Sequence, residues 1–142
     1  MKPESIRKFD MFYLGSLAIS VVSIIVGYDA LVAEVAAEGE ASGMALGQVW
    51  AIGAVVIGLA ISLLLWWLTS SKRLSIAKWI IVLFFVLGLI GLPGTLADGL
   101  TMLEIIGLVS VAAQATAIWY LFRPDAKEWF AGSSPVDPKT FD

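Results

Sequence analysis

All nine Lys and Arg residues of this 142-residue chain lie on one side of a pattern of four hydrophobic segments. They occupy the N-terminal ten residues, the second interruption and the C-terminal segment: Lys2, Arg7, Lys8, Lys72, Arg73, Lys78, Arg123, Lys127 and Lys139. The first and third interruptions carry acids and no base: Asp29, Glu34, Glu38, Glu40 and Asp98. Short loops rich in Lys and Arg stay on the cytoplasmic side of a membrane. The pattern therefore predicts four spans, with both chain ends in the cytoplasm.

Each of the four segments is close to the length that a helix needs to cross a bilayer, about 20 residues. We expect the spans at about 9–33, 44–69, 76–92 and 102–122, all within one transmembrane domain over 1–130. Pro93 and Gly94 are expected to end the third span. Residues 131–142 are rich in Gly, Ser and Pro and are expected to form a mobile cytoplasmic tail. The predicted fold is an all-α bundle of four transmembrane helices.

Composition excludes several function classes. The hydrophobic fraction is 59%, whereas soluble domains contain about 45–50% apolar residues. The chain has no Cys and no His, so it lacks thiol chemistry and the commonest haem ligand and general base. We therefore expect neither an enzyme nor a bound cofactor or metal. The few basic residues lie beside the membrane, where they suit anionic lipid headgroups, and nucleic acid is not an expected partner.

Aromatic residues mark the same membrane boundaries. Trp66 and Trp67 close the second span, Trp79 opens the third, and Trp119 and Tyr120 close the fourth. Aromatic side chains are enriched at membrane–water interfaces. All five are therefore predicted to lie near the cytoplasmic interface.

Small residues follow one helical face in each of the first two spans. The stripes comprise Ser16, Ser20, Ser23 and Gly27 in the first span, and Gly47, Ala51, Ala54, Gly58 and Ser62 in the second. Small faces allow helices to approach closely in lipid, which favours a tight antiparallel hairpin of these spans. A seam between copies of the chain and the lining of a pore are the alternatives. In the hairpin, Gly58→Leu is expected to separate the two helices and destabilise the fold.

Two polar residues are predicted within the fourth span. Gln114 is expected to hydrogen-bond across helices, with Ser16, Ser20 or Ser62 as partner, or to contact a ligand. Glu104 is a candidate for proton coupling because intramembrane acids are often functional. The order Thr101-Met-Leu-Glu104 also matches a capping box, in which Glu104 caps the start of the helix. We favour capping for Glu104 and a packing role for Gln114.

The segment after the fourth span begins Arg123-Pro-Asp-Ala-Lys-Glu-Trp-Phe130. Pro124 can open a helix, and Trp129 and Phe130 can return to the headgroup layer, which predicts a short interfacial helix. It would anchor the chain end or serve as a docking handle. The Pro-x-x-Lys-x-Trp-Phe ending and the four-span layout resemble those of small uncharacterised bacterial membrane proteins. This resemblance implies a bacterial cytoplasmic membrane and no particular activity.

These patterns predict a non-catalytic integral membrane protein. It would be an accessory or assembly subunit of a larger membrane complex, or a scaffold that associates with itself. Its expected partners are membrane lipids and either another membrane protein or further copies of the chain. A small homo-oligomeric transporter or channel is the alternative function.

Overall fold

The computed structural model describes residues 1–45, 47–96 and 99–132. Within those ranges it contains six α-helices and no strand. The helices are α1 (Glu4–Val26), α2 (Tyr28–Ala41), α3 (Gln48–Ser70), α4 (Ser75–Leu96), α5 (Met102–Leu121) and α6 (Pro124–Ala131). Four of them, α1, α3, α4 and α5, are long and apolar enough to cross a membrane. The predicted all-α bundle of four membrane helices is confirmed, whereas the predicted tail lies outside the described residues from 133 onward.

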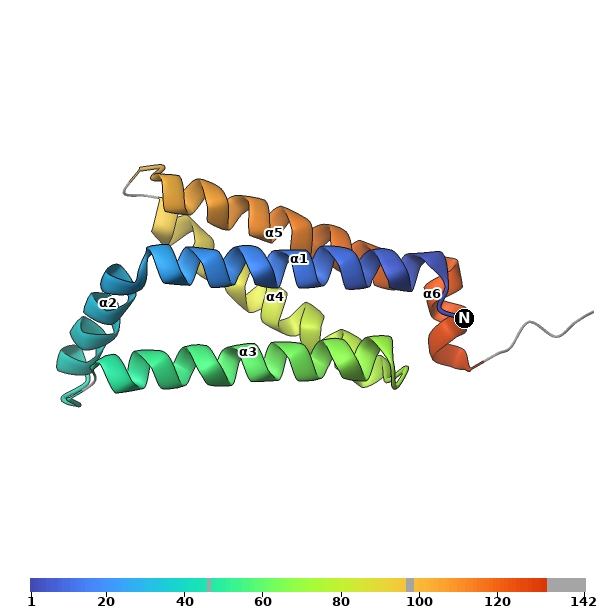
Figure 1. Ribbon diagram of the computed structural model, residues 1–142, viewed down its shortest axis with the longest axis horizontal. Helices are drawn as coiled ribbons and strands as arrows, with labels where there is room; N and C mark the ends of the chain where they lie inside the picture. The colour runs from blue at the N-terminus through green and yellow to red at the C-terminus, as the bar shows by residue number, and fades with distance from the viewer. Residues whose placement is uncertain (46, 97–98, 133–142) are drawn as a thin grey trace, which may run out of the picture.

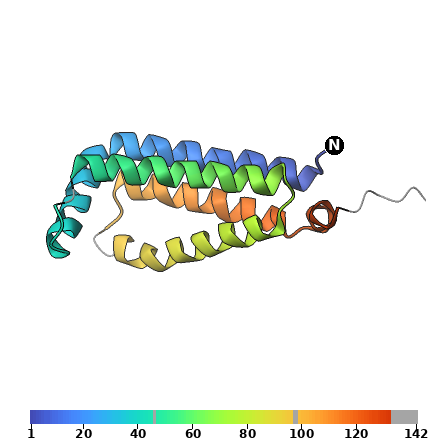
Figure 2. The ribbon, with the colours of Figure 1, turned by 90° about the horizontal axis from the view of Figure 1, so that it is seen from below.

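The four long helices lie lengthwise, and their connections gather at two ends (Figure 1). One end holds the start of α1, the turn between α3 and α4, and α6. We call it the basic end because every Lys and Arg in the described ranges lies there. The other is the acidic end, which contains α2 with its four carboxylates. Figure 2 shows α4 along the face of the bundle away from α1 and α3, and α4 contacts both α3 and α5.

The closest helix pair is formed by α1 and α5, which run antiparallel (Figure 1). At the basic end the Ser5 hydroxyl donates to Asp125 Oδ1 over 2.7 Å, just beyond α5. Halfway along, the Ser110 hydroxyl donates to the Ser16 carbonyl over 3.0 Å. At the acidic end Gly27 lies against Leu103. The two helices therefore keep one register along the whole length of α1.

Gly27 separates α1 from α2. A Cβ atom at this position would lie 3.1 Å from the Ser23 carbonyl oxygen and 3.2 Å from a methyl carbon of Leu103. The absence of a side chain therefore favours this close approach to α5, because Leu103 would have to shift to admit one. Beyond Gly27 the chain turns away as α2 and reaches the start of α3 (Figure 1). The first apolar helix therefore covers Glu4–Val26, and the expected span of 9–33 extends beyond it into α2.

Pro93 does not end α4, contrary to the sequence expectation. The helix continues to Leu96. A proline removes one backbone hydrogen bond to the preceding turn, and here this loss falls within the last turn of the helix. Membrane helices tolerate such positions. The third apolar helix therefore contains a stretch of 20 residues, Ser75–Gly94, that is long and apolar enough to cross a membrane. It is as long as the corresponding stretch of α5.

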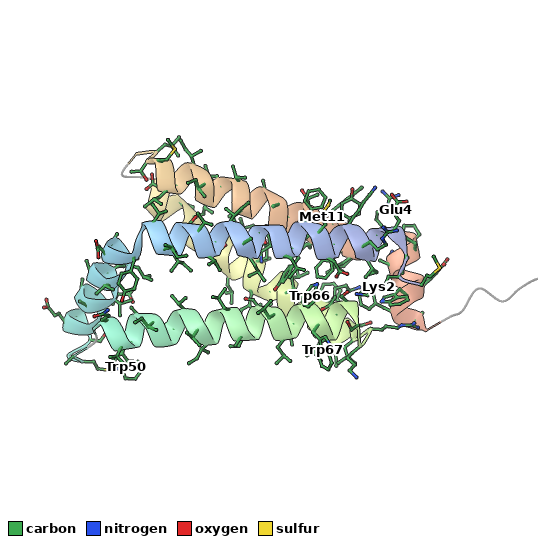
Figure 3. The ribbon with its side chains drawn as sticks, in the orientation of Figure 1. Lys2, Glu4, Met11, Trp50, Trp66 and Trp67 are labelled. Carbon is green, nitrogen blue, oxygen red and sulfur yellow. The ribbon has the colours of Figure 1, made fainter. Side chains whose placement is uncertain are left out.

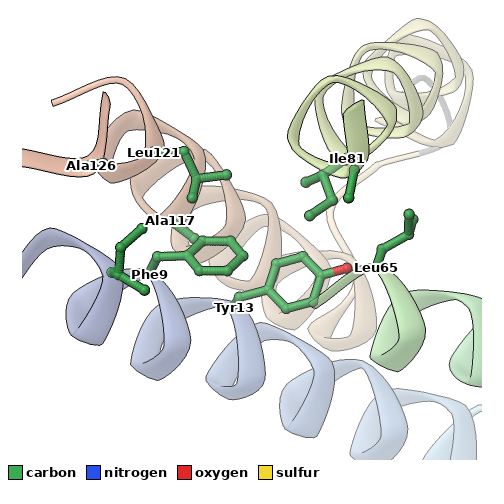
Figure 4. Packing of buried hydrophobic residues seen from close by; sticks show 9 residues of the cluster. Phe9, Tyr13, Leu65, Ile81, Ala117, Leu121 and Ala126 are labelled. Carbon is green, nitrogen blue, oxygen red and sulfur yellow. The ribbon is translucent and has the colours of Figure 1, made fainter. Parts of the chain in front are cut away.

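The buried apolar core lies at the basic end. It comprises Ile6, Phe9, Tyr13, Leu65, Ala77, Ile81, Ala117, Leu121 and Ala126, and Figure 4 shows the rings of Phe9 and Tyr13 between α5 and the start of α4. These residues come from five helices, including the short α6. Towards the acidic end, by contrast, most apolar side chains of α3 and α4 are exposed. Internal packing therefore holds the bundle together mainly at its basic end.

The structure differs from the expected hairpin of the first two spans. The serine face of α1 packs against α5, and α1 makes far fewer contacts with α3, among them the Asp10–Trp66 and Tyr13–Ser62 hydrogen bonds. A Cβ atom added at Gly58 would meet nothing within 4 Å. The expected destabilisation by Gly58→Leu therefore has no close contact within the chain to cause it, because Gly58 borders an open pocket.

Candidate functional site

Polar side chains join α1 to α3 near the basic end. The indole N–H of Trp66 donates to Asp10 Oδ1 over 2.9 Å. The Lys2 ammonium lies 3.1 Å from Asp10 Oδ2 and donates to the Ser70 hydroxyl over 2.7 Å. Figure 3 shows Lys2 and Trp66 between the two helices, while Trp67 points away from α1. Asp10 is thus an ionisable group in a first-span helix that is held by an indole and a lysine.

One helical turn further along α1, the Tyr13 hydroxyl donates to the backbone carbonyl of Ser62 over 3.1 Å. The hydroxyl of Ser62 itself donates to the Gly58 carbonyl. Tyr13 is 3% exposed, so its ring is part of the core and its hydroxyl reaches α3. The Asp10 and Tyr13 contacts form two successive polar links between α1 and α3.

Beside these links, the four long helices line a cavity of about 260 Å³ that is partly open at the surface, where Gly58, Ile61 and Phe84 are exposed. Its walls are Tyr13, Gly58, Ile61, Ser62, Leu65, Ile81, Phe84 and Gln114. None of these eight residues carries a charged side chain at neutral pH. The cavity is the most developed candidate binding site in the described part of the chain, because it combines apolar walls with a few polar groups.

Gln114 lies on the wall contributed by α5. The serines expected to bond it have other partners: the Ser16 hydroxyl donates to the Tyr13 carbonyl and the Ser20 hydroxyl to the Ser16 carbonyl. Across the α1–α5 contact, Ser110 lies 3.1 Å from the Ser20 hydroxyl. Ser110 therefore has the interhelical role expected of Gln114. Among the described residues, no hydrogen bond satisfies the Gln114 carboxamide.

The two small-residue stripes have different surroundings. On α1, Ser16 is buried and Gly27 contacts Leu103, and the hydroxyl of Ser23 donates to the Ile19 carbonyl of its own helix. On α3, Ala51 is buried, but Ala54 and Gly58 are exposed, and Gly47 precedes the helix. The α3 stripe borders an open apolar groove of about 400 Å³, lined by Val49, Trp50, Gly53, Ala54 and Ile57.

Glu104 caps α5, which confirms the capping box. The Glu104 backbone N–H donates to the Thr101 hydroxyl over 3.3 Å, and the Glu104 carboxylate accepts from the Thr101 backbone N–H. A carboxylate at this position also meets the positive end of the helix dipole. The acid lies at the start of the helix, away from the cavity that Gln114 lines.

The short helix α6 lies against the turn between α3 and α4. The Arg73 guanidinium lies 3.8 Å from the centroid of the Trp129 ring, and the Lys78 ammonium lies 5.1 Å from that of Phe130. Burial raises the pKa of the nearby Asp125 carboxyl, but hydrogen bonds from the side chain and backbone of Ser5 and from the backbone of Asp125 and Ala126 together lower it more, so that its pKa lies below the usual range. These contacts tie α6 to both α1 and the α3–α4 turn.

Sequence reasoning missed Asp10, Tyr13 and Trp66 as members of a site. A signal was present, because Asp10 and Tyr13 are three residues apart and share a helix face. Trp66 and Trp67 could not be distinguished by composition, because both suit the interface. Only the placement of α3 decides which indole faces Asp10.

The described ranges contain no group of three His, Cys, Asp or Glu side chains that could hold a metal ion. No protein-family model, no curated protein and no solved structure matches this chain. The structure alone places the chain in the class of helical bundles whose four long helices are able to cross a membrane.

Proposed function

We propose that the chain is a non-catalytic integral membrane protein that presents α3 to another membrane helix, as an accessory subunit of a larger complex or as a self-associating scaffold. The open groove along α3 is the main support for this proposal. It is lined by Val49, Trp50, Gly53, Ala54 and Ile57. Small residues in such a groove allow a second helix to approach closely, and packing drives association in lipid.

The distribution of internal contacts supports this proposal. Ser16 and Ser20 of α1 bond to Ser110 of α5. On α3, by contrast, Ala54 is exposed and a Cβ atom added at Gly53 would meet nothing within 4 Å. Trp50 is 63% exposed and Val49 is 83% exposed beside the groove. A second helix seated there would bury both side chains against Gly53 and Ala54.

The first test is the native mass and composition of the protein after gentle extraction from its own membrane. A homo-oligomer or a stoichiometric complex with other membrane proteins supports the proposal. A monomer bound only to lipid contradicts it.

Cross-linking locates the contact, because the chain has no cysteine of its own. Gly53→Cys places a thiol in the groove, and Ala115→Cys places one on an exposed face of α5 as the matched control. Oxidation in native membranes should link the Gly53→Cys variant to a second copy, or a bifunctional thiol reagent should link it to a partner. Equal cross-linking of both variants contradicts a specific α3 contact.

We further propose that the protein resides in a bacterial cytoplasmic membrane with both chain ends in the cytoplasm, as the distribution of Lys and Arg favours. Ser42 and Ser71 are exposed residues that follow α2 and α3 at opposite ends of the bundle. A membrane-impermeant maleimide should label Ser42→Cys in intact cells and Ser71→Cys only after permeabilisation. The reverse pattern contradicts the proposed orientation.

A second candidate function is a small homo-oligomeric transporter or channel. The cavity walls favour it, because Gln114 and the Tyr13–Ser62 link place polar groups within membrane-length helices. Purified protein in liposomes should then pass small solutes, and Gln114→Leu should reduce the flux. Leakage equal to that of empty liposomes excludes this candidate for the solutes tested.

A further inference from the structure

We propose that the cavity between α1, α3, α4 and α5 binds a small, uncharged ring compound with one hydroxyl or carbonyl group, which hydrogen-bonds to Gln114. The site is independent of the groove on α3 that carries the proposed function. Three properties of the cavity define this ligand: its volume, the chemistry of its walls and the free carboxamide of Gln114.

The volume limits the size of the ligand. An apolar protein cavity of roughly 150 Å³ holds one benzene molecule. The cavity here measures about 260 Å³, so by proportion it accommodates about ten non-hydrogen atoms. This size suits a bicyclic ring or a substituted single ring.

The walls select an uncharged and largely apolar ligand. Ile61, Leu65 and Ile81 are aliphatic, and the rings of Tyr13 and Phe84 supply flat faces. No side chain that lines the cavity carries a charge at neutral pH, so a charged ligand would lose its hydration without a counterion. A ring can stack against the aromatic walls, which adds to the contact that an aliphatic ligand would make.

The polar groups of the cavity leave one hydrogen-bonding position open. The Tyr13 hydroxyl donates to the Ser62 carbonyl, and the Ser62 hydroxyl donates to the Gly58 carbonyl. Gln114 is half-buried and has no hydrogen-bond partner among the described residues, and an unpaired amide in apolar surroundings is unfavourable. A ligand hydroxyl can accept from the carboxamide N–H or donate to its oxygen.

The test uses 2-naphthol, with naphthalene as the matched compound that lacks the hydroxyl. The protein is placed in lipid nanodiscs, and bound compound is measured by equilibrium dialysis against empty nanodiscs of the same lipid. We expect saturable binding of 2-naphthol at one site per chain. Binding equal to partition into empty nanodiscs overturns the proposal.

Two variants locate the site. Gln114→Leu should weaken 2-naphthol binding about five- to tenfold, because one hydrogen bond is lost, and should leave naphthalene binding undiminished. Gly58→Leu should abolish binding of both compounds, because a leucine at this open position fills the cavity. Ala115→Leu lies on an exposed face of α5 and should change neither.

Circular dichroism and the thermal unfolding midpoint establish that each variant is folded. If Gly58→Leu does not fold, the comparison of the two compounds on Gln114→Leu remains decisive. Equal weakening of 2-naphthol and naphthalene by Gln114→Leu overturns the role of the carboxamide. A stoichiometric phospholipid that 2-naphthol does not displace would assign the cavity to a lipid chain and overturn the proposal.

Discussion

The indole N–H of Trp66 in α3 lies 2.9 Å from a carboxylate oxygen of Asp10 in α1. These two helices make far fewer contacts with each other than α1 makes with α5. Asp10 is 20% exposed and is also paired with Lys2. A carboxylate within a membrane-length helix is costly unless it is paired and hydrogen-bonded. The two partners of Asp10 meet that requirement, and together they fix the position of α3 relative to α1.

Trp66→Phe should destabilise the bundle by about 1–3 kcal/mol, because it removes a hydrogen bond to a charged group and leaves that group partly unsatisfied. Trp67→Phe is the matched control, since this neighbouring side chain is 43% exposed and points away from α1 (Figure 3). Unfolding in mixed micelles with increasing SDS measures the difference. Equal effects of the two variants would show that the Asp10 contact contributes nothing specific.

Ser110→Ala should cost about 0.5–1.5 kcal/mol, because the Ser110 hydroxyl bonds to the Ser16 carbonyl across the α1–α5 contact. Ser23→Ala removes a hydroxyl that bonds only within α1, and should cost less. The same SDS titration compares them. A larger loss for Ser23→Ala would contradict the assignment of the α1–α5 register.

Gly27→Leu should destabilise the fold by about 1–3 kcal/mol through overpacking against α5. The new Cβ atom would meet the Ser23 carbonyl oxygen and Leu103 at 3.1 and 3.2 Å. Gly15→Leu is the control, because a Cβ atom there meets nothing within 4 Å. Thermal unfolding followed by circular dichroism distinguishes the two, and similar midpoints would argue against close packing at Gly27.

Stability should fall at acidic pH partly through Asp125. Burial raises the pKa of this carboxyl, but the hydrogen bonds from Ser5 and from the backbone of Asp125 and Ala126 together outweigh burial, and the pKa lies below its usual value of 3.8. Since the folded-state pKa lies below the unfolded value, the stabilisation is complete above pH 3.8 and is lost as pH falls through the folded pKa. The unfolding midpoint of Asp125→Asn should depend less on pH between about 5 and 2 than that of the unmodified chain. Parallel pH profiles would contradict this contribution.

Thr101→Ala should cost about 1 kcal/mol, because it removes the side-chain cap of α5. Glu104→Gln should cost less, since glutamine can also accept from the Thr101 backbone in a capping box. Both values follow from chemical or thermal unfolding. If Glu104→Gln abolished a measurable transport activity while the fold stayed intact, capping would not account for Glu104.

Much of this architecture follows from local sequence. Span number follows from hydrophobic length, because a bilayer requires about 20 apolar residues of every helix that crosses it. The cap at Thr101 and Glu104 and the start of α6 at Pro124 depend on neighbours within four residues. These features can be predicted without knowing which helices pack against each other.

The pairing of helices could not be predicted in the same way. Small-residue stripes occur on both α1 and α3, so the sequence is compatible with packing of these two helices against each other or of each against another helix. The choice of α5 as partner of α1 depends on Ser110 and on the space left for Leu103 beside Gly27. The cavity at Gln114 escaped prediction for the same reason, since its walls come from four helices.

The partnership of α1 with α5 also constrains how the chain is made. Synthesis proceeds from the N-terminal end, so α1 enters the membrane three spans before its main partner exists. Contacts between distant segments slow folding because a long loop must close first. Ser16 and Ser20 of α1 therefore lack their hydrogen-bond partner Ser110 until the intervening helices have inserted. During that interval the nascent chain depends on lipid, or on the insertion machinery, to shield a face that the finished bundle covers.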